Sequence, residues 1–185
     1  TVTFTPVSFA IPGQPSYAPV NYDGRFHGNV SLRTALANSY NVPAVKVLNR
    51  IGVANMLEMG KRMGITTWND DSRFGLALTL GGGEVTLLEL TGVYGILANA
   101  GKKVDIDPIV RITDFTGKIM YETGVPQTKP TLSEEIAFIL SDILADNQAR
   151  SAAFGETSAL VIPGKTVSVK TGTTNDKRDN WTIGY

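Results

Sequence analysis

Apolar residues recur every three or four positions in five segments of the chain, and this spacing predicts five helices. Residues that commonly begin or end helices flank these segments. The first predicted helix follows Ser31, the second runs from near Pro43 to Gly52, and the third covers 54–63. The fourth follows Thr86, which begins a capping-box pattern, and the fifth follows Ser133. The buried side of the fifth helix should carry Ile136, Ile139, Leu140 and Ile143.

Alternating apolar and polar residues predict strands in the later part of the chain. Residues 109–121 are expected to form a hairpin that turns at 114–117, and 161–170 and 180–185 are expected to be further strands. The first 28 residues are rich in Pro, Gly, Tyr and Asn and predict irregular structure. No repeat or linker divides the chain, so residues 1–185 are taken as one domain. Helices in the middle with strands late in the chain predict an α+β fold.

The composition argues against several classes of function. The chain has 185 residues, of which 42% are hydrophobic and 18% charged, as in an ordinary globular domain. Seventeen basic and seventeen acidic residues cancel, so the basic surface of a nucleic-acid-binding protein is absent. Without cysteine there is no disulfide or cysteine-ligated metal, and one histidine, His27, leaves little material for a zinc site or a Ser–His triad.

Lys170, Thr171 and Gly172 are the strongest candidates for chemistry. They end a predicted strand, and a lysine and a hydroxyl beside strand N–H groups can bind a carboxylate or an oxyanion. Gly172 lacks a side chain, so a substrate backbone can approach closely. Ser39 and Asn41, in a corner between two predicted helices, suit the same kind of site. A simpler interpretation stays open: Ser39 and Asn41 could cap helices, and Lys170 could end an exposed strand.

Several longer stretches resemble, in the same order, the transpeptidase domain of class A penicillin-binding proteins. The resemblance covers the chain from about Tyr17 onward and implies an α+β fold with helices packed on an antiparallel sheet, as in the penicillin-binding protein and β-lactamase superfamily. The stretches that carry it are 21–28 (NYDGRFHG), 32–39 (LRTALANS), 41–45 (NVPAV), 80–86 (LGGGEVT), 146–150 (DNQAR) and 170–176 (KTGTTND).

In that family the serine of a Ser-x-x-Lys motif attacks the D-Ala-D-Ala bond of a peptidoglycan stem peptide, and an amine of a second stem resolves the acyl-enzyme. β-Lactams trap this intermediate. By resemblance, Ser39 would relay protons and Lys170 would supply a positive field. Asn41 would bind the donor's amide and Thr171 and Thr173 its terminal carboxylate, and the Thr173 N–H would form half of an oxyanion hole. No metal or cofactor is implied.

The resemblance also implies a parent protein that acts at the extracytoplasmic face of the bacterial cell membrane. Such a protein would carry a membrane anchor and a glycosyltransferase domain. Within residues 1–185, no apolar stretch reaches transmembrane length and no signal peptide is visible.

The chain departs from the family pattern at the nucleophile, because no serine is followed three positions later by lysine. We therefore expect the nucleophile to lie upstream of Thr1 and the last strands of the sheet to follow Tyr185. The domain would then be incomplete at both ends and inactive alone.

Two other functions are weighed against the transpeptidase. A β-lactamase is disfavoured, because the Glu-x-x-x-Asn pattern of class A β-lactamases is absent after Glu58, Glu84 and Glu89. A non-catalytic module of the same fold that binds or senses peptidoglycan or β-lactams stays open as the alternative.

Overall fold

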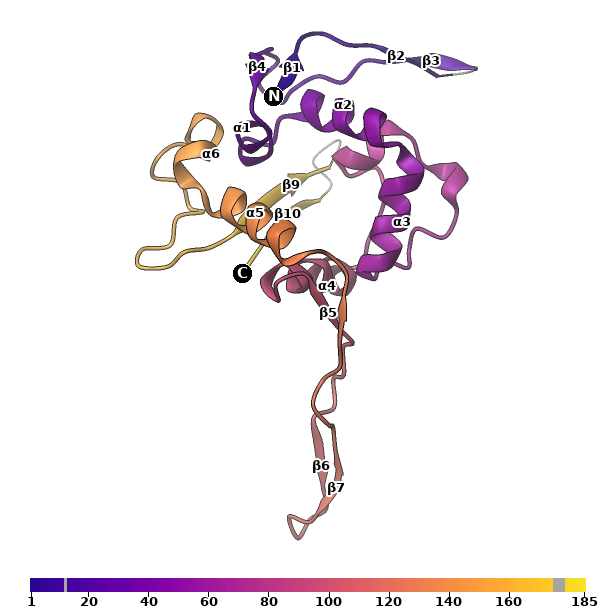
Figure 1. Ribbon diagram of the computed structural model, residues 1–185, viewed down its shortest axis with the longest axis vertical. Helices are drawn as coiled ribbons and strands as arrows, with labels where there is room; N and C mark the ends of the chain where they lie inside the picture. Colours follow the sequence, from indigo (N-terminus) through magenta and orange to yellow (C-terminus); the bar gives the residue numbers. More distant parts are fainter. Residues whose placement is uncertain (12, 175–178) are drawn as a thin grey trace.

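The computed structural model describes residues 1–11, 13–174 and 179–185, which fold into an α+β architecture (Figure 1). The helices are α1 (Leu32–Ala37), α2 (Asn41–Ile51), α3 (Val53–Met63), α4 (Leu87–Ala98), α5 (Glu134–Ala145) and α6 (Asn147–Phe154), with two short 3-10 helices, η1 (Asp71–Arg73) and η2 (Leu76–Leu80). Among these residues, no helix has both the length and the apolar character that a membrane span requires.

The strands of the described residues form antiparallel pairs. They are β1 (Val2–Phe4) with β4 (Gly28–Val30), β2 (Phe9–Ile11) with β3 (Gln14–Tyr17), β5 (Lys102–Val104) with β8 (Thr128–Pro130), β6 (Arg111–Thr113) with β7 (Ile119–Glu122), and β9 (Val169–Thr173) with β10 (Asn180–Gly184).

The capped helices begin where the sequence predicts. The Ser31 hydroxyl accepts a hydrogen bond of 3.0 Å from Thr34 N–H at the start of α1, and Ser133 caps α5 in the same way. At α4, Glu89 N–H donates to Thr86 Oγ1 at 3.1 Å while Thr86 N–H donates to Glu89 Oε2 at 3.0 Å. These bonds satisfy N–H groups that the first turn of a helix leaves without an intrahelical partner.

The apolar core consists of two clusters. One lies between α2, α3 and η2, and the other between α4 and α5. Because α4 also packs against β10 and α5 against β9, the β9–β10 hairpin is supported by the same helices that build the core (Figure 1). The buried members are Leu48, Leu57, Ile65, Trp68 and Leu78 in the first cluster and Leu97, Ala137 and Leu144 in the second.

The β9–β10 hairpin carries the segment with the predicted lysine. In its register Lys170 lies opposite Ile183. Beside the strands, Ser168 and Tyr185 exchange two backbone hydrogen bonds of 3.0 Å each. The Tyr185 hydroxyl is also 2.6 Å from Ser141 Oγ on α5. The start of β9 is therefore held by backbone hydrogen bonds to Tyr185, and the side chain of Tyr185 links this end of the hairpin to α5.

The strand β9 starts later than the pattern over 161–170 predicts. Pro163 and Gly164 form a turn that is closed by a hydrogen bond of 3.1 Å from Lys165 N–H to Ile162 O. Gly164 has φ of +72°, and proline followed by such a glycine is typical of a type II turn. Apolar alternation alone therefore overestimated the length of the strand.

Two further predictions need correction. The first 28 residues are not wholly irregular, because their extended segments pair as β1 with β4 and β2 with β3. On α5, Ile136 and Ile139 are 50% and 53% exposed instead of buried, whereas Ile143 is buried as predicted and Leu140 is half-buried. Ala137 and Leu144 are also buried. Positions 137 and 144 lie on one face of the helix, two turns apart, and Ile139 lies almost opposite to them.

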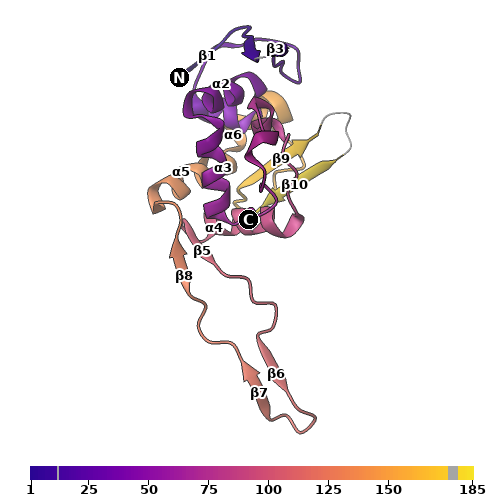
Figure 2. The same ribbon diagram turned by 90° about the vertical axis from the view of Figure 1, so that its right-hand side faces the viewer.

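Residues 102–131 form an arm that reaches away from the body of the molecule (Figures 1 and 2). β5 and β8 pair at its base, and β6 and β7 pair toward its tip. The predicted hairpin turn at 114–117 is confirmed, and Asp114 Oδ1 accepts a hydrogen bond of 2.8 Å from Thr116 N–H there. No residue from 104 to 130 is buried, so the arm contributes little to the core.

Candidate functional site

Ser39 lies in the predicted corner between α1 and α2, with a left-handed backbone at φ of +58°. Ser39 N–H donates to Leu36 O at 3.1 Å, and Tyr40 N–H donates to Ala35 O at 2.9 Å. For a residue with a Cβ, this conformation costs about 1–2 kcal/mol. The two hydrogen bonds at the end of α1 hold it nevertheless, and strain of this kind is common at functional sites.

Lys170 meets Ser39 although the two residues are 131 positions apart. Lys170 Nζ donates hydrogen bonds to Ser39 Oγ and, at 2.7 Å, to Thr171 O. Burial disfavours the charged ammonium, and the positive charge of Arg150 adds to this, so the pKa of Lys170 falls to about 8. Lys170 can therefore exchange a proton near neutral pH, directly beside the Ser39 hydroxyl.

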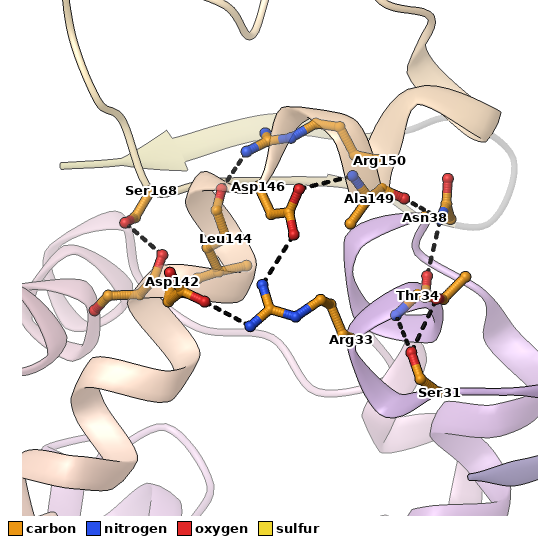
Figure 3. Close-up of polar contacts among 11 residues, drawn as sticks. Ser31, Arg33, Thr34, Asn38, Asp142, Leu144, Asp146, Ala149, Arg150 and Ser168 are labelled. Atoms are coloured by element: carbon orange, nitrogen blue, oxygen red, sulfur yellow. Dashed lines mark hydrogen bonds and ion pairs between the residues drawn. The ribbon is translucent and has the colours of Figure 1, made fainter.

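Arg150, on α6, is a second cation close to this pair. It is buried, its guanidinium donates to Leu144 O, and its Nε has no hydrogen-bond partner among the described residues (Figure 3). Burial lowers the pKa of Arg150, and the negative charge of Asp146 opposes that change. Water screens a buried cation poorly, and this explains why the charge of Arg150 lowers the pKa of Lys170.

The other predicted ligand groups continue along β9. Thr171 is half-buried, whereas Gly172 and Thr173 are exposed. A Cβ added to Gly172 would meet no atom within 4 Å, so the space beside it is open. Thr173 Oγ1 donates to Asn180 Oδ1 at 3.4 Å. Hydroxyls and an open backbone position thus follow Lys170 on one strand, where a ligand backbone can lie alongside.

Asn41 is the first residue of α2 and faces the N-terminal segment. Its Nδ2 donates to Val20 O at 2.9 Å, and the neighbouring Asn21 Oδ1 accepts a hydrogen bond of 3.2 Å from Val42 N–H. Both bonds tie residues 20 and 21 to α2. Tyr40, not Asn41, occupies the N-cap position of that helix. Asn41 therefore follows Ser39 by two residues in the chain, and one of its two amide N–H groups is engaged by the N-terminal segment.

Two residues that flank the pair, Arg150 and Asn38, are not among the predicted site residues. Both are buried polar side chains, and their burial comes from contacts between helices distant in the chain, which periodicity does not reveal. Among the described residues, no group of three His, Asp or Glu side chains could hold a metal ion. Asn175 and Asp176, the end of the stretch that starts at Lys170, lie outside the described residues.

Comparison with known sequences gives one family and a set of relatives. The penicillin binding protein transpeptidase domain matches residues 3–185. Penicillin-binding protein 1A of Rickettsia bellii (strain RML369-C) is 32% identical, over 94% of this chain and 24% of that protein. Penicillin-binding protein 1A of Aquifex aeolicus (strain VF5) is 35% identical, over 91% of this chain and 22% of that protein. The chain thus spans about a quarter of the length of these relatives.

Comparison with solved structures supports the same fold. The crystal structure of penicillin-binding protein 1A from Haemophilus influenzae matches with a TM-score of 0.84 and 24% identity, over 100% of this chain and 32% of that chain. Penicillin-binding protein A from M. tuberculosis, solved as an imipenem acyl-enzyme complex, matches with a TM-score of 0.77 and 20% identity, over 99% of this chain and 45% of that chain. The predicted α+β fold is confirmed.

Proposed function

The chain belongs to the penicillin-binding protein transpeptidase family, and from that premise we propose that it is part of a peptidoglycan D,D-transpeptidase that cross-links stem peptides through an acyl-serine intermediate. The donor is the D-Ala-D-Ala end of one stem, the acceptor is an amine of another, and β-lactams trap the acyl-enzyme. The observation that carries the proposal is the hydrogen bond between Lys170 and Ser39. It unites two predicted catalytic residues from distant segments at a partly desolvated position.

In this proposal Ser39 relays a proton between the nucleophile's lysine and Lys170. The positive charge of Lys170 favours the ionised, attacking state of the nucleophile and the negative charge that develops on the carbonyl oxygen. A lysine with a pKa of about 8 suits this task, because it is mostly charged at neutral pH and still exchanges protons readily.

The donor peptide lies along β9 in the proposed complex. Thr171 and Thr173 bind its terminal carboxylate, the Thr173 N–H donates to the oxyanion, and Gly172 allows the close approach. The open space beside Gly172 supports this placement. Asn41 binds the donor's amide. One of its amide N–H groups donates to Val20 O, which leaves the second N–H for the ligand.

The attacking serine is proposed to come from a Ser-x-x-Lys motif outside residues 1–185. No serine of this chain is followed three positions later by lysine, and the relatives are about four times as long as this chain. Residues 1–185 alone are accordingly expected to be inactive toward penicillin. The chemistry needs no metal or cofactor, since the serine, lysine and backbone N–H groups supply the nucleophile, field and oxyanion donors.

The proposed partners follow from the same reaction. They are peptidoglycan stem peptides and β-lactams, and the balanced charge of the chain argues against nucleic acid. Because peptidoglycan is assembled outside the cytoplasm, we place the site at the extracytoplasmic face of the bacterial cell membrane. A membrane anchor and a glycosyltransferase domain in the same polypeptide are further parts of the proposal.

The test is intact-mass analysis of the full-length protein after treatment with penicillin. We expect a stable adduct of one drug molecule that maps to the serine of a Ser-x-x-Lys motif. The Lys170→Ala variant should form the adduct far more slowly, while residues 1–185 expressed alone should form none. An adduct on residues 1–185 alone would contradict the assignment of the nucleophile.

The alternative function is a non-catalytic module that binds or senses peptidoglycan or β-lactams. The observation that favours it is the absence of a Ser-x-x-Lys serine from these residues. A folded full-length protein that binds penicillin reversibly, with no covalent adduct, would establish this alternative and overturn the transpeptidase.

A further inference from the structure

The side chain of Asn38 joins two helices directly beside the serine–lysine contact. Asn38 is 4% exposed, and its Nδ2 donates to Thr34 O at 2.9 Å and to Ala149 O at 2.7 Å. Its Oδ1 accepts a hydrogen bond of 2.9 Å from Ala153 N–H. Figure 3 shows Asn38 between Thr34 on α1 and Ala149 on α6. The Asn38 amide therefore forms hydrogen bonds to the last turn of α1 and to the backbone of α6 simultaneously.

On α6, Asn38 contacts one C=O group and one N–H group, those of Ala149 and Ala153. Ala149 and Ala153 are four residues apart, so the C=O of one and the N–H of the other are partners in the hydrogen-bond ladder of an α-helix. The Asn38 amide offers this pair a donor and an acceptor, as another peptide group would. An aspartate only accepts at neutral pH, and a leucine of similar size does neither. The contact is therefore specific for an amide of this length.

We propose that Asn38 is a positioning residue of the transpeptidase site, which fixes Ser39 against Lys170 by fastening the end of α1 to α6. Ser39 directly follows Asn38 and has φ of +58°, so a displacement of Asn38 carries the Ser39 hydroxyl with it. The inference rests on the proposed function, because it assigns Asn38 to the same reaction.

The position of α6 supports this role from the other side of the pair. Arg150 extends from α6, is buried, and acts on Lys170 through its charge. The same helix thus holds Ser39 through Asn38 and influences Lys170 through Arg150. A loosened α1–α6 contact is expected to disturb the geometry between hydroxyl and ammonium while most of the core stays packed.

The test is a double-mutant cycle on the full-length protein, with the rate constant of acylation by a fluorescent penicillin as the readout. Asn38→Ala should slow acylation by roughly 10- to 100-fold, the effect expected when a reacting group is displaced by about 1 Å. In the Ser39→Ala background, Asn38→Ala should cause almost no further loss, because Asn38 acts through Ser39. Equal losses in both backgrounds would show a general structural role and overturn the proposal.

Two more variants separate positioning from stability. Asn38→Ser keeps a local hydrogen bond to Thr34 O and loses the link to α6, so it should slow acylation like Asn38→Ala and answers the question if the alanine variant does not fold. Arg33→Met is the matched control, because Arg33 also joins α1 to the α5–α6 region, through Asp142 and, at 2.9 Å, Asp146 (Figure 3). It should lower the melting temperature and leave the acylation rate of the folded protein unchanged.

The outcomes distinguish this inference from the proposed function. If the wild-type protein forms no adduct, the proposed function fails. If the wild type reacts, Ser39→Ala is slow and the folded Asn38 variants react at the wild-type rate, only the positioning role fails. A loss in Arg33→Met as large as that in Asn38→Ala would also overturn it, because any loosening of α1 would then suffice.

Discussion

Lys170 Nζ donates a hydrogen bond to Ser39 Oγ across 131 positions of sequence. Ser39 arrives at this contact from the end of α1, and Lys170 from β9. One helix, α5, packs against both of these elements, so its position sets the separation between hydroxyl and ammonium. The contact is a product of tertiary packing, and changes that displace the end of α1 at Ser39 relative to β9 should affect the reaction before they unfold the protein.

The rate of acylation by penicillin should fall as the pH rises through about 8. Burial and Arg150 lower the pKa of Lys170 to about 8, so its charge, and the field it supplies, is mostly present below this pH and is lost above it. The measurement is the pH–rate profile of the full-length protein between pH 6 and 10. Lys170→Arg, which stays charged over this range, should lack this alkaline limb. A wild-type profile that stays flat to pH 10 would contradict the role of the charged lysine.

Arg150→Met should move that alkaline limb to higher pH. The positive charge of Arg150 disfavours a charged Lys170, so its removal raises the pKa of the lysine. The measurement is again the midpoint of the limb, or a direct NMR titration of Lys170. Arg33→Met is the control, because Arg33 is paired with carboxylates and does not contribute to the lowered pKa of Lys170. This variant should leave the midpoint of the limb in place. In Arg150→Met, a midpoint that stays in place or moves to lower pH would show that the two cations do not interact.

The sequence predicted local elements better than contacts between them. The helix starts at Ser31, Thr86 and Ser133 depend on hydrogen bonds within one turn, and their patterns are readable in order along the chain. The exposure of Ile139 and the burial of Arg150 depend on which helix faces meet, and no local pattern contains that information.

The candidate site shows the same division. Ser39 and Lys170 were predicted from their motifs, and the structure brings the two side chains together. The contacts of Asn38 and the effect of Arg150 on the pKa of Lys170 could not be predicted, because they arise only when α6 packs beside α1 and Lys170. The roles of Asn41 and the β9 residues after Lys170 stay predictions, since they concern a ligand.

Gly172→Ala should leave the fold intact and impair the reaction. An added Cβ meets nothing within 4 Å, so the free energy of unfolding should change by less than about 0.5 kcal/mol. If a donor peptide or penicillin lies along β9, the same methyl group obstructs it and the acylation rate falls. Gly184→Ala on the paired strand is the matched control, because its Cβ would lie 2.7 Å from Ser168 O and should destabilise the hairpin. Unchanged acylation in a stable Gly172→Ala protein would argue against the proposed donor position.

Gly60→Ala should destabilise the core around α3. An added Cβ would lie 2.5 Å from the ring of buried Trp68, so the ring must shift, at a cost of about 1–3 kcal/mol. Chemical denaturation monitored by tryptophan fluorescence measures this change. Gly95→Ala, in the last turn of α4 with open space around its Cβ, is the control and should stabilise the protein by up to about 1 kcal/mol through helix propensity. Equal effects of the two substitutions would show that Trp68 does not pack on Gly60.

The distal arm should be removable without loss of the fold. In the shortened variant, residues 105–127 are replaced by Asn-Gly, a pair that favours the two-residue turn needed between β5 and β8. None of the removed residues is buried, and the ion pair of Asp105 with Lys129 that is lost is exposed, so it contributes at most about 1 kcal/mol. The shorter connection also reduces the entropy cost of closing the loop.

We therefore expect the free energy of unfolding of the arm-deleted variant to lie within about 1 kcal/mol of the wild-type value. Leu97→Ala in the α4–α5 core is the sensitivity control, because removing a buried leucine side chain costs about 2–5 kcal/mol. A loss in the shortened variant as large as that of Leu97→Ala would mean that the arm packs on the body of the domain. Retained stability would mean that the exposed apolar residues of the arm, among them Phe115 and Val125, contribute little to the stability of the fold.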